Sequence, residues 1–180
     1  MPIKSKLIIP LIILLTILLP ISLKAQDTKV KMFKVSESGI NEEIGLITLQ
    51  ETTEGILFTP NLKNLPAGER GFHIHSNPSC EVSLDDKNNI VPAGKAGSHY
   101  DPDLTNKHLG PQKHGHKGDL PKLLVNKEGI ANTPILFTKY KKLTDINNLS
   151  LIIHEGSDNY EDTPQKLGGG GKRIACGIIK

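Results

Sequence analysis

The chain has 180 residues, with 22 Lys or Arg against 19 Asp or Glu. Three of the basic residues lie in the first 25 positions, so the rest of the chain carries 19 residues of each sign. This balance gives no support for a nucleic acid or an anionic membrane as a partner. The length after position 25 suits one domain with a sizeable core and leaves little room for a second.

Residues 1–25 have the pattern of a secretory signal peptide. Two lysines precede an apolar run over residues 7–21, and the small residue Ala25 follows shortly after it. A transmembrane anchor is the alternative, but a span needs roughly 20 apolar residues, and two prolines interrupt this shorter run. We therefore expect cleavage close to Ala25, a mature domain over residues 26–180, and no stable membrane anchor after cleavage.

Cys80 and Cys176 are the two cysteines of the chain, and both lie outside the predicted signal peptide. In an exported protein an even number of cysteines favours a disulfide bond. Such a bond would close a loop of roughly 100 residues, for which loop-closure entropy gives at most about 4 to 5 kcal/mol of stability.

Short segments with strand character recur along the chain, turn-forming residues separate them, and no convincing amphipathic helix or internal repeat is visible. The predicted strands cover residues 30–35, 44–49, 56–62, 71–76, 122–125, 135–139, 150–154 and 174–179. Residues 77–120 and 155–171 lack regular periodicity, and loops of this length are usually functional or disordered. The sequence therefore predicts an all-β antiparallel barrel or sandwich with two large functional loops.

A His-x-His pair lies in the predicted strand over residues 71–76. Because side chains alternate along a strand, His73 and His75 share one face and can hold one ion. Taken alone, the pattern also fits two polar residues on a solvated strand face. The long loop that follows favours the metal.

This loop is rich in residues that bind metals, namely His99, His108, His114, His116 and Asp119. Imidazoles with one carboxylate suit zinc or copper far better than magnesium or calcium. A soluble His-rich loop would explain the composition, but not the placement of Asp119 after His116 with flanking glycines that let both side chains turn to one centre. His154 ends a later apolar strand, where a structural histidine is the alternative to a ligand.

Together these motifs resemble the bacterial periplasmic copper/zinc superoxide dismutases. The resemblance rests on GFHIHSNPSC at residues 71–80, HYDP at 99–102, HLGP at 108–111, GHKGDLP at 115–121, IHEGSDNY at 153–160 and LGGGGKRIACG at 167–177. It extends over nearly all of the mature chain. It implies a Greek-key β-barrel of about eight strands and a periplasmic enzyme that converts superoxide to oxygen and hydrogen peroxide, as either a monomer or a homodimer.

Carried over residue by residue, the resemblance implies two metal sites that share one histidine. Copper would be bound by His73, His75, His99 and His154, and zinc by His99, His108, His116 and Asp119. The interval between His108 and His116 is one residue shorter than is usual in bacterial members, which makes His114 a rival zinc ligand. The local Gly-His-x-Gly-Asp context favours His116.

The resemblance also implies roles around the metals. Asp158 would hydrogen-bond a copper-side and a zinc-side histidine together, and Arg173 would attract and orient superoxide. His99 would leave copper during the cycle and help to deliver protons, while zinc keeps its oxidation state. The alternative is a non-catalytic exported copper/zinc-binding module on the same fold, which would be expected to lack one of His73, His75, His154 or Arg173.

Overall fold

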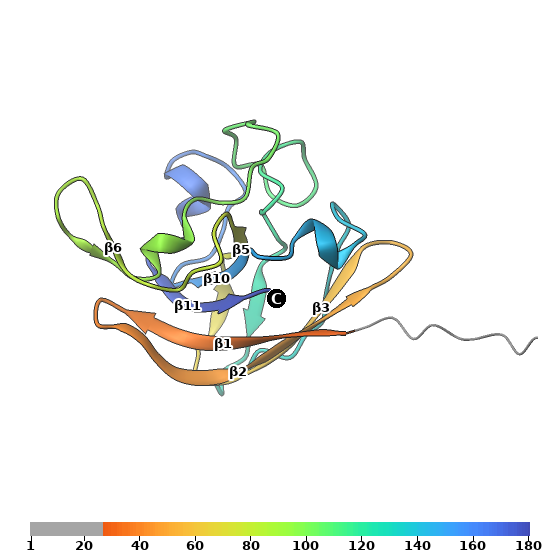
Figure 1. The fold of residues 1–180 in the computed structure, drawn as a ribbon, viewed down its shortest axis with the longest axis horizontal. Helices are drawn as coiled ribbons and strands as arrows, with labels where there is room; N and C mark the ends of the chain where they lie inside the picture. Colours follow the sequence, from red (N-terminus) through yellow and green to blue (C-terminus); the bar gives the residue numbers. More distant parts are fainter. Residues whose placement is uncertain (1–26) are drawn as a thin grey trace, which may run out of the picture.

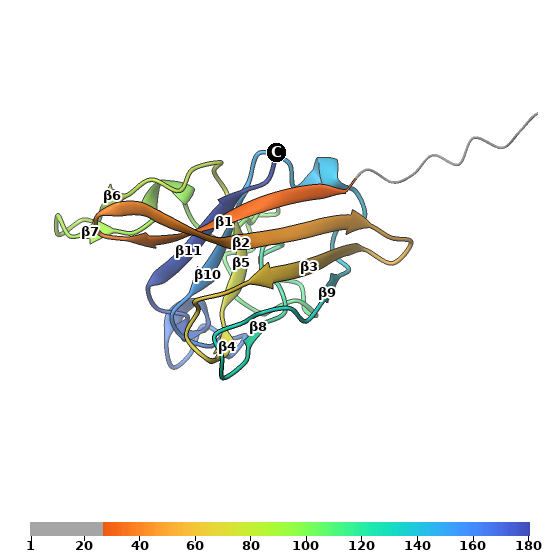
Figure 2. The same cartoon turned by 90° about the horizontal axis from the view of Figure 1, so that it is seen from below.

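The computed structural model describes residues 27–180, so the predicted signal peptide lies outside the described residues. Its main element is a seven-stranded antiparallel sheet in the order β5-β10-β11-β1-β2-β3-β9. The sheet curls strongly, and both long loops lie on the side away from β1 and β2 (Figures 1 and 2). Its strands are β1 (Thr28–Ser36), β2 (Gly39–Glu51), β3 (Ile56–Leu62), β5 (Phe72–His75), β9 (Ile135–Phe137), β10 (Ser150–His154) and β11 (Arg173–Ile178).

Two short antiparallel pairs and three single-turn helices complete the described fold. The pairs are β4 (Gly68–Arg70) with β8 (Leu123–Val125), and β6 (Ser83–Leu84) with β7 (Ile90–Val91). The 3-10 helices are η1 (Gly94–Ala96), η2 (Leu143–Asp145) and η3 (Lys166–Gly169). Among residues 27–180, no helix is long and apolar enough to cross a membrane.

All eight predicted strands are present, and the all-β fold class is confirmed. The structure adds β4, β6 and β7, which are two or three residues long and therefore too short to show a period of two. Strand β2 begins five residues earlier than predicted, because a tight turn after β1 lets polar residues continue the hairpin pairing.

Contacts between aromatic rings show how far the sheet curls. Phe72 lies on edge strand β5 and Phe137 on the opposite edge strand β9. Both rings contact Phe58 edge to face, with centroids 6.1 and 6.4 Å away. The three rings are fully buried, so the two edges of the sheet close around one hydrophobic core.

Backbone hydrogen bonds tie the first long loop to β5. Ile74 N donates to Gly118 O, and Tyr100 N donates to Ile74 O, each at 2.9 Å. An isolated bridge also joins His73 to Asp119. The loop therefore returns alongside the strand, which brings its polar residues against those of β5.

The predicted disulfide bond joins Cys80 to Cys176, with the Cα atoms 5.7 Å apart. Both residues are buried. Cys176 lies on β11 and Cys80 in the loop after β5, so the bond ties the start of that loop to the last strand.

Candidate metal centre

Four buried histidines meet beside the edge strand β5 and its neighbour β10. His73 and His75 lie on β5, His154 ends the neighbouring strand β10, and His99 reaches them from the first long loop. Each offers a nitrogen, and these atoms all lie within 4.8 Å of one another. The His-x-His pair shares one face as predicted, because the residues that alternate with it pack in the core.

In three of these rings, one nitrogen has a hydrogen-bond partner and the other has none. The partnered atoms are His73 Nε2 with Asp158 Oδ2 at 2.7 Å, His75 Nδ1 with Gly97 O at 2.9 Å, and His154 Nδ1 with Gly171 O at 3.1 Å. The buried atoms without a partner are His73 Nδ1, His75 Nε2 and His154 Nε2. Such atoms are costly unless they bind something. An imidazole oriented through one nitrogen, with the other free, is a typical ligand of copper or zinc.

Burial also fixes the protonation state of this group. It lowers the pKa of His75 and of His154 well below 6.5, and it lowers the pKa of His99 to about 3. Positive charge on neighbouring groups, including Arg173, acts in the same direction on His75 and His154. The three imidazoles are therefore neutral at neutral pH, which is the form that binds a metal ion.

A second buried group is centred on the carboxylate of Asp119. The Nδ1 atoms of His99, His108 and His116 lie 2.9, 3.1 and 3.4 Å from its oxygens. Burial disfavours the charged form of His108, but the close carboxylates of Asp119 and Asp158 outweigh this and raise the pKa of His108 to about 9. Three imidazoles converging on one carboxylate are a suitable ligand set for zinc.

The four residues of this second group whose ligand atoms lie within 4.8 Å of one another are His73, His99, His108 and Asp119. This group therefore contains His73 in the place where the sequence predicts His116. The ring of His73 lies 3.9 Å from the ring of His99. His116 lies at its edge: it is buried, and its Nδ1 has no hydrogen-bond partner. The rival His114 is exposed.

Asp158 joins the two groups. Its carboxylate oxygens lie 2.7 Å from His73 Nε2 and 2.8 Å from His108 Nε2. Burial would raise the pKa of Asp158, but these contacts hold it well below its usual value. Gly168 packs directly on this bridge at a φ of 70°, and a Cβ there would lie 2.0 Å from Asp158 Oδ1. Packing against Asp158 therefore requires a glycine at position 168, within the glycine run that ends the second loop.

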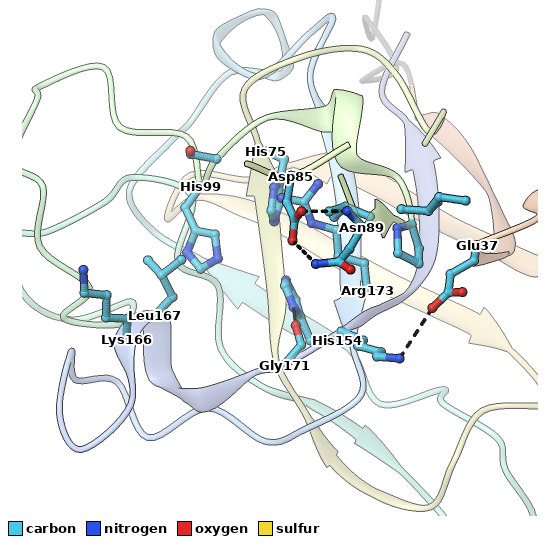
Figure 3. Close-up of a pocket in the computed structure, with 15 residues that line it drawn as sticks. Glu37, His75, Asp85, Asn89, His99, His154, Lys166, Leu167, Gly171 and Arg173 are labelled. Carbon is cyan, nitrogen blue, oxygen red and sulfur yellow. Dashed lines mark hydrogen bonds and ion pairs between the residues drawn. The ribbon is translucent and has the colours of Figure 1, made fainter. Parts of the chain in front are cut away.

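A cavity of about 700 Å³ opens over the first histidine group (Figure 3). His75, His99, His154 and Arg173 are among the residues that line it. The guanidinium of Arg173 donates to two backbone carbonyls at 2.6 Å each, so it is fixed at the wall. A permanent cation beside neutral imidazoles makes this cavity suitable for a small anion.

Gly97 is a functional residue that the sequence reasoning missed. Its carbonyl oxygen lies 2.9 Å from His75 Nδ1 and accepts a hydrogen bond from Arg173 Nη2 at 2.6 Å. Its φ of 79° turns the backbone there. The signal available in the sequence was an isolated glycine two residues before His99.

Comparisons with known proteins agree with this geometry. The family described as copper/zinc superoxide dismutase (SODC) matches residues 43–179. The chain belongs to the copper/zinc superoxide dismutase family. A Salmonella typhimurium relative named Cu-Zn superoxide dismutase 2 is 46% identical over 167 residues, which cover 93% of this chain and 96% of the relative.

Solved structures place the chain in the same family. The Cu/Zn superoxide dismutase from Brucella abortus has a TM-score of 0.84 and 44% identity, over 86% of this chain and 100% of that one. The monomeric copper, zinc superoxide dismutase from Salmonella enterica has a TM-score of 0.78 and 48% identity, with the same coverage of both chains. The predicted superoxide dismutase barrel and the predicted bacterial family are thereby confirmed.

Proposed function

We propose that this chain is a superoxide dismutase that uses copper and zinc and converts two superoxide ions and two protons to oxygen and hydrogen peroxide. One observation carries the proposal: two groups of buried ligand atoms overlap at His73 and His99, and the Asp158 carboxylate contacts both His73 and His108. Identity of 44 to 48% to proteins named as copper/zinc superoxide dismutases supports it.

The proposed copper ligands are His73, His75, His99 and His154, and the proposed zinc ligands are His99, His108, His116 and Asp119. The buried nitrogens without partners support this assignment. When bound, copper supplies reversible one-electron chemistry at the cavity, and zinc supplies a charge that does not change. The burial and orphaned Nδ1 of His116, against the exposure of His114, support His116 as the ligand.

His99 is the residue proposed to hold and release a proton. Its Nδ1 lies against Asp119, so its Nε2 is the nitrogen available to the copper side. The residue also lines the cavity, where substrate can reach it. With both metals bound, His99 would contact two cations only after losing both ring protons, and its Nε2 is the atom that could take a proton back.

Arg173 is the residue proposed to draw in the substrate. Its guanidinium stays charged at any physiological pH, and its two carbonyl partners aim it along the cavity wall. It can therefore attract superoxide and hold it beside the proposed copper ligands.

A non-catalytic copper/zinc-binding module is the less favoured alternative, because the chain retains the complete set of His73, His75, His154 and Arg173. The test is to load purified residues 26–180 with both metals and follow superoxide decay. We expect strong acceleration over the metal-free protein. A loaded protein that leaves the decay rate unchanged would contradict the proposal and favour the module.

We further propose that residues 1–25 direct the chain to the periplasm and are removed, which leaves the enzyme over residues 26–180. Mass spectrometry of the protein from a periplasmic fraction should find a new N-terminus close to position 26; an intact N-terminus in a membrane fraction would contradict this. The Salmonella enterica structure is of a monomer. For this chain, sedimentation analysis distinguishes a monomer from the homodimer that the family also allows.

A further inference from the structure

Lys139 is a partly buried lysine that follows β9. None of the ion pairs found among residues 27–180 includes it. Its Nζ instead donates to two backbone carbonyls of the first long loop, Gly110 O at 3.0 Å and His116 O at 2.8 Å. A lysine ammonium placed in this way has a specific structural task, because charged donors make strong hydrogen bonds to carbonyl oxygens.

The two carbonyls belong to the two limbs of the loop that carry proposed zinc ligands. Gly110 lies two residues after His108, and His116 is itself a proposed ligand. Elsewhere these limbs are joined by the hydrogen bond from His116 N to Lys107 O at 2.9 Å. Lys139 therefore crosslinks the limbs from the barrel side and fixes their separation.

His116 is the proposed zinc ligand whose position depends most on the loop. Its Nδ1 is 3.4 Å from Asp119, the longest of the three imidazole distances, and it stands outside the group of atoms within 4.8 Å. No strand carries it. The backbone around His116 therefore sets how closely its ring approaches Asp119. Lys139 donates a hydrogen bond to the His116 carbonyl and so holds that backbone.

We propose that Lys139 is a positioning residue for the zinc half, which clamps the two limbs so that His116 reaches the metal. The inference rests on the proposed assignment of His108 and His116 as zinc ligands. The direction of the effect is diagnostic. A nearby ammonium repels a divalent cation, so removal of the charge alone would strengthen zinc binding, whereas removal of the clamp weakens it.

Three variants test the clamp. Lys139→Met removes the charge and the donors, and Lys139→Arg keeps both. Lys113→Met is the matched control, because Lys113 is exposed, lines the same surface depression as Lys139 and takes part in none of the side-chain hydrogen bonds or ion pairs found in residues 27–180. Zinc dissociation constants are measured by competition with a chelator on the metal-free proteins, and the zinc-induced rise in Tm is measured in parallel.

We expect zinc to bind about 10 to 100-fold more weakly to Lys139→Met, with a smaller zinc-induced rise in Tm. Lys113→Met should match the wild type, and Lys139→Arg should recover most of the affinity. Cobalt(II) bound at the same site should show altered visible absorption bands in Lys139→Met, which a general loss of stability does not produce. Should Lys139→Met not fold, Lys139→Ala serves in its place, because it also removes the charge and the donors.

Unchanged or tighter zinc binding by Lys139→Met would overturn the clamp. An equal loss in Lys113→Met would overturn it as well, since the loss would then not depend on the hydrogen bonds that Lys139 makes to the loop. So would a lower Tm of the metal-free protein with an undiminished zinc-induced rise, which marks a purely structural lysine. If the wild type itself bound no zinc, or if His116→Ala left zinc binding intact, the proposed ligand set would fail, and the clamp with it.

Discussion

The two halves of the metal centre are built in different ways. Three of the four proposed copper ligands lie on the paired strands β5 and β10, whose register places His73 opposite Ile152 and His75 opposite Ser150. None of the proposed zinc ligands lies on a strand; all come from the loop between η1 and β8. The barrel therefore preorganises the copper half, whereas hydrogen bonds and close-packed glycines position the zinc half.

The electrostatics of the halves differ in the same way. On the copper side, burial keeps His75 and His154 neutral, and each has a free nitrogen. On the zinc side, Asp119 is buried, yet the close approach of three histidine rings to its carboxylate keeps its pKa well below the usual value. His75 and His154 can bind an ion without releasing a proton, whereas His108 on the zinc side must release one.

Replacement of a copper ligand should have the largest effect, and it should affect the copper half alone. His75→Ala removes a strand-borne ligand and should abolish superoxide dismutation, because copper is no longer held at the cavity. Zinc binding should persist, since the loop keeps its own ligands. Metal content and superoxide decay are measured together, with His114→Ala as the control that keeps both metals and full activity. Loss of zinc with retained activity would reverse the assignment of the two halves.

Removal of the disulfide bond should have the next largest effect. In the double variant Cys80→Ser/Cys176→Ser, the free energy of unfolding should fall by about 2 to 5 kcal/mol, because the unfolded chain regains the freedom that the bond removes. Urea unfolding of the metal-free proteins measures this change, and the oxidised wild type is the reference. A loss below about 0.5 kcal/mol, the usual size for a surface substitution, would show that the bond does not hold the loop.

Asp158 tests whether the two halves are joined. Asp158→Asn keeps the shape of the side chain but removes the charge that binds His73 and His108. Both metals should bind about 10 to 100-fold more weakly. Competition with chelators measures each affinity in turn. Asp162→Asn, on the same loop, is a control, because the Asp162 carboxylate accepts hydrogen bonds from the backbone N–H groups of His108 and Leu167 and, among residues 27–180, from no histidine ring. Loss at one metal alone would show that the halves are independent.

The smallest and most specific expected difference between the two halves is in how their metal affinities depend on pH. Because the pKa of His108 is raised to about 9 in the metal-free protein, zinc must displace its proton below that pH. Release of the His108 proton should therefore raise the zinc affinity about tenfold per pH unit between pH 7 and 9. Copper affinity of the zinc-free protein should change less over this range, because His75 and His154 are already neutral. Equal slopes would contradict the contrast.

The same contrast explains how much could be predicted from the sequence. The period of two along a strand was sufficient to place His73 and His75 on one face, and the apolar run before His154 indicated its strand. No periodicity governs the loop, so His108 and His116 could be assigned only through the family resemblance. The carbonyl of Gly97 and the clamp of Lys139 depend on which distant segments meet, and short-range sequence patterns carry no information about that.

The shared residue His99 is the centre of the account, and anomalous diffraction from crystals of the metal-loaded protein tests it most directly. Data collected at the copper and zinc absorption edges should place copper among His73, His75, His99 and His154, and zinc among His99, His108, His116 and Asp119. The His99 ring should lie between the two ions and contact both. Two ions that do not share His99, or zinc bound by His114 in place of His116, would contradict the account.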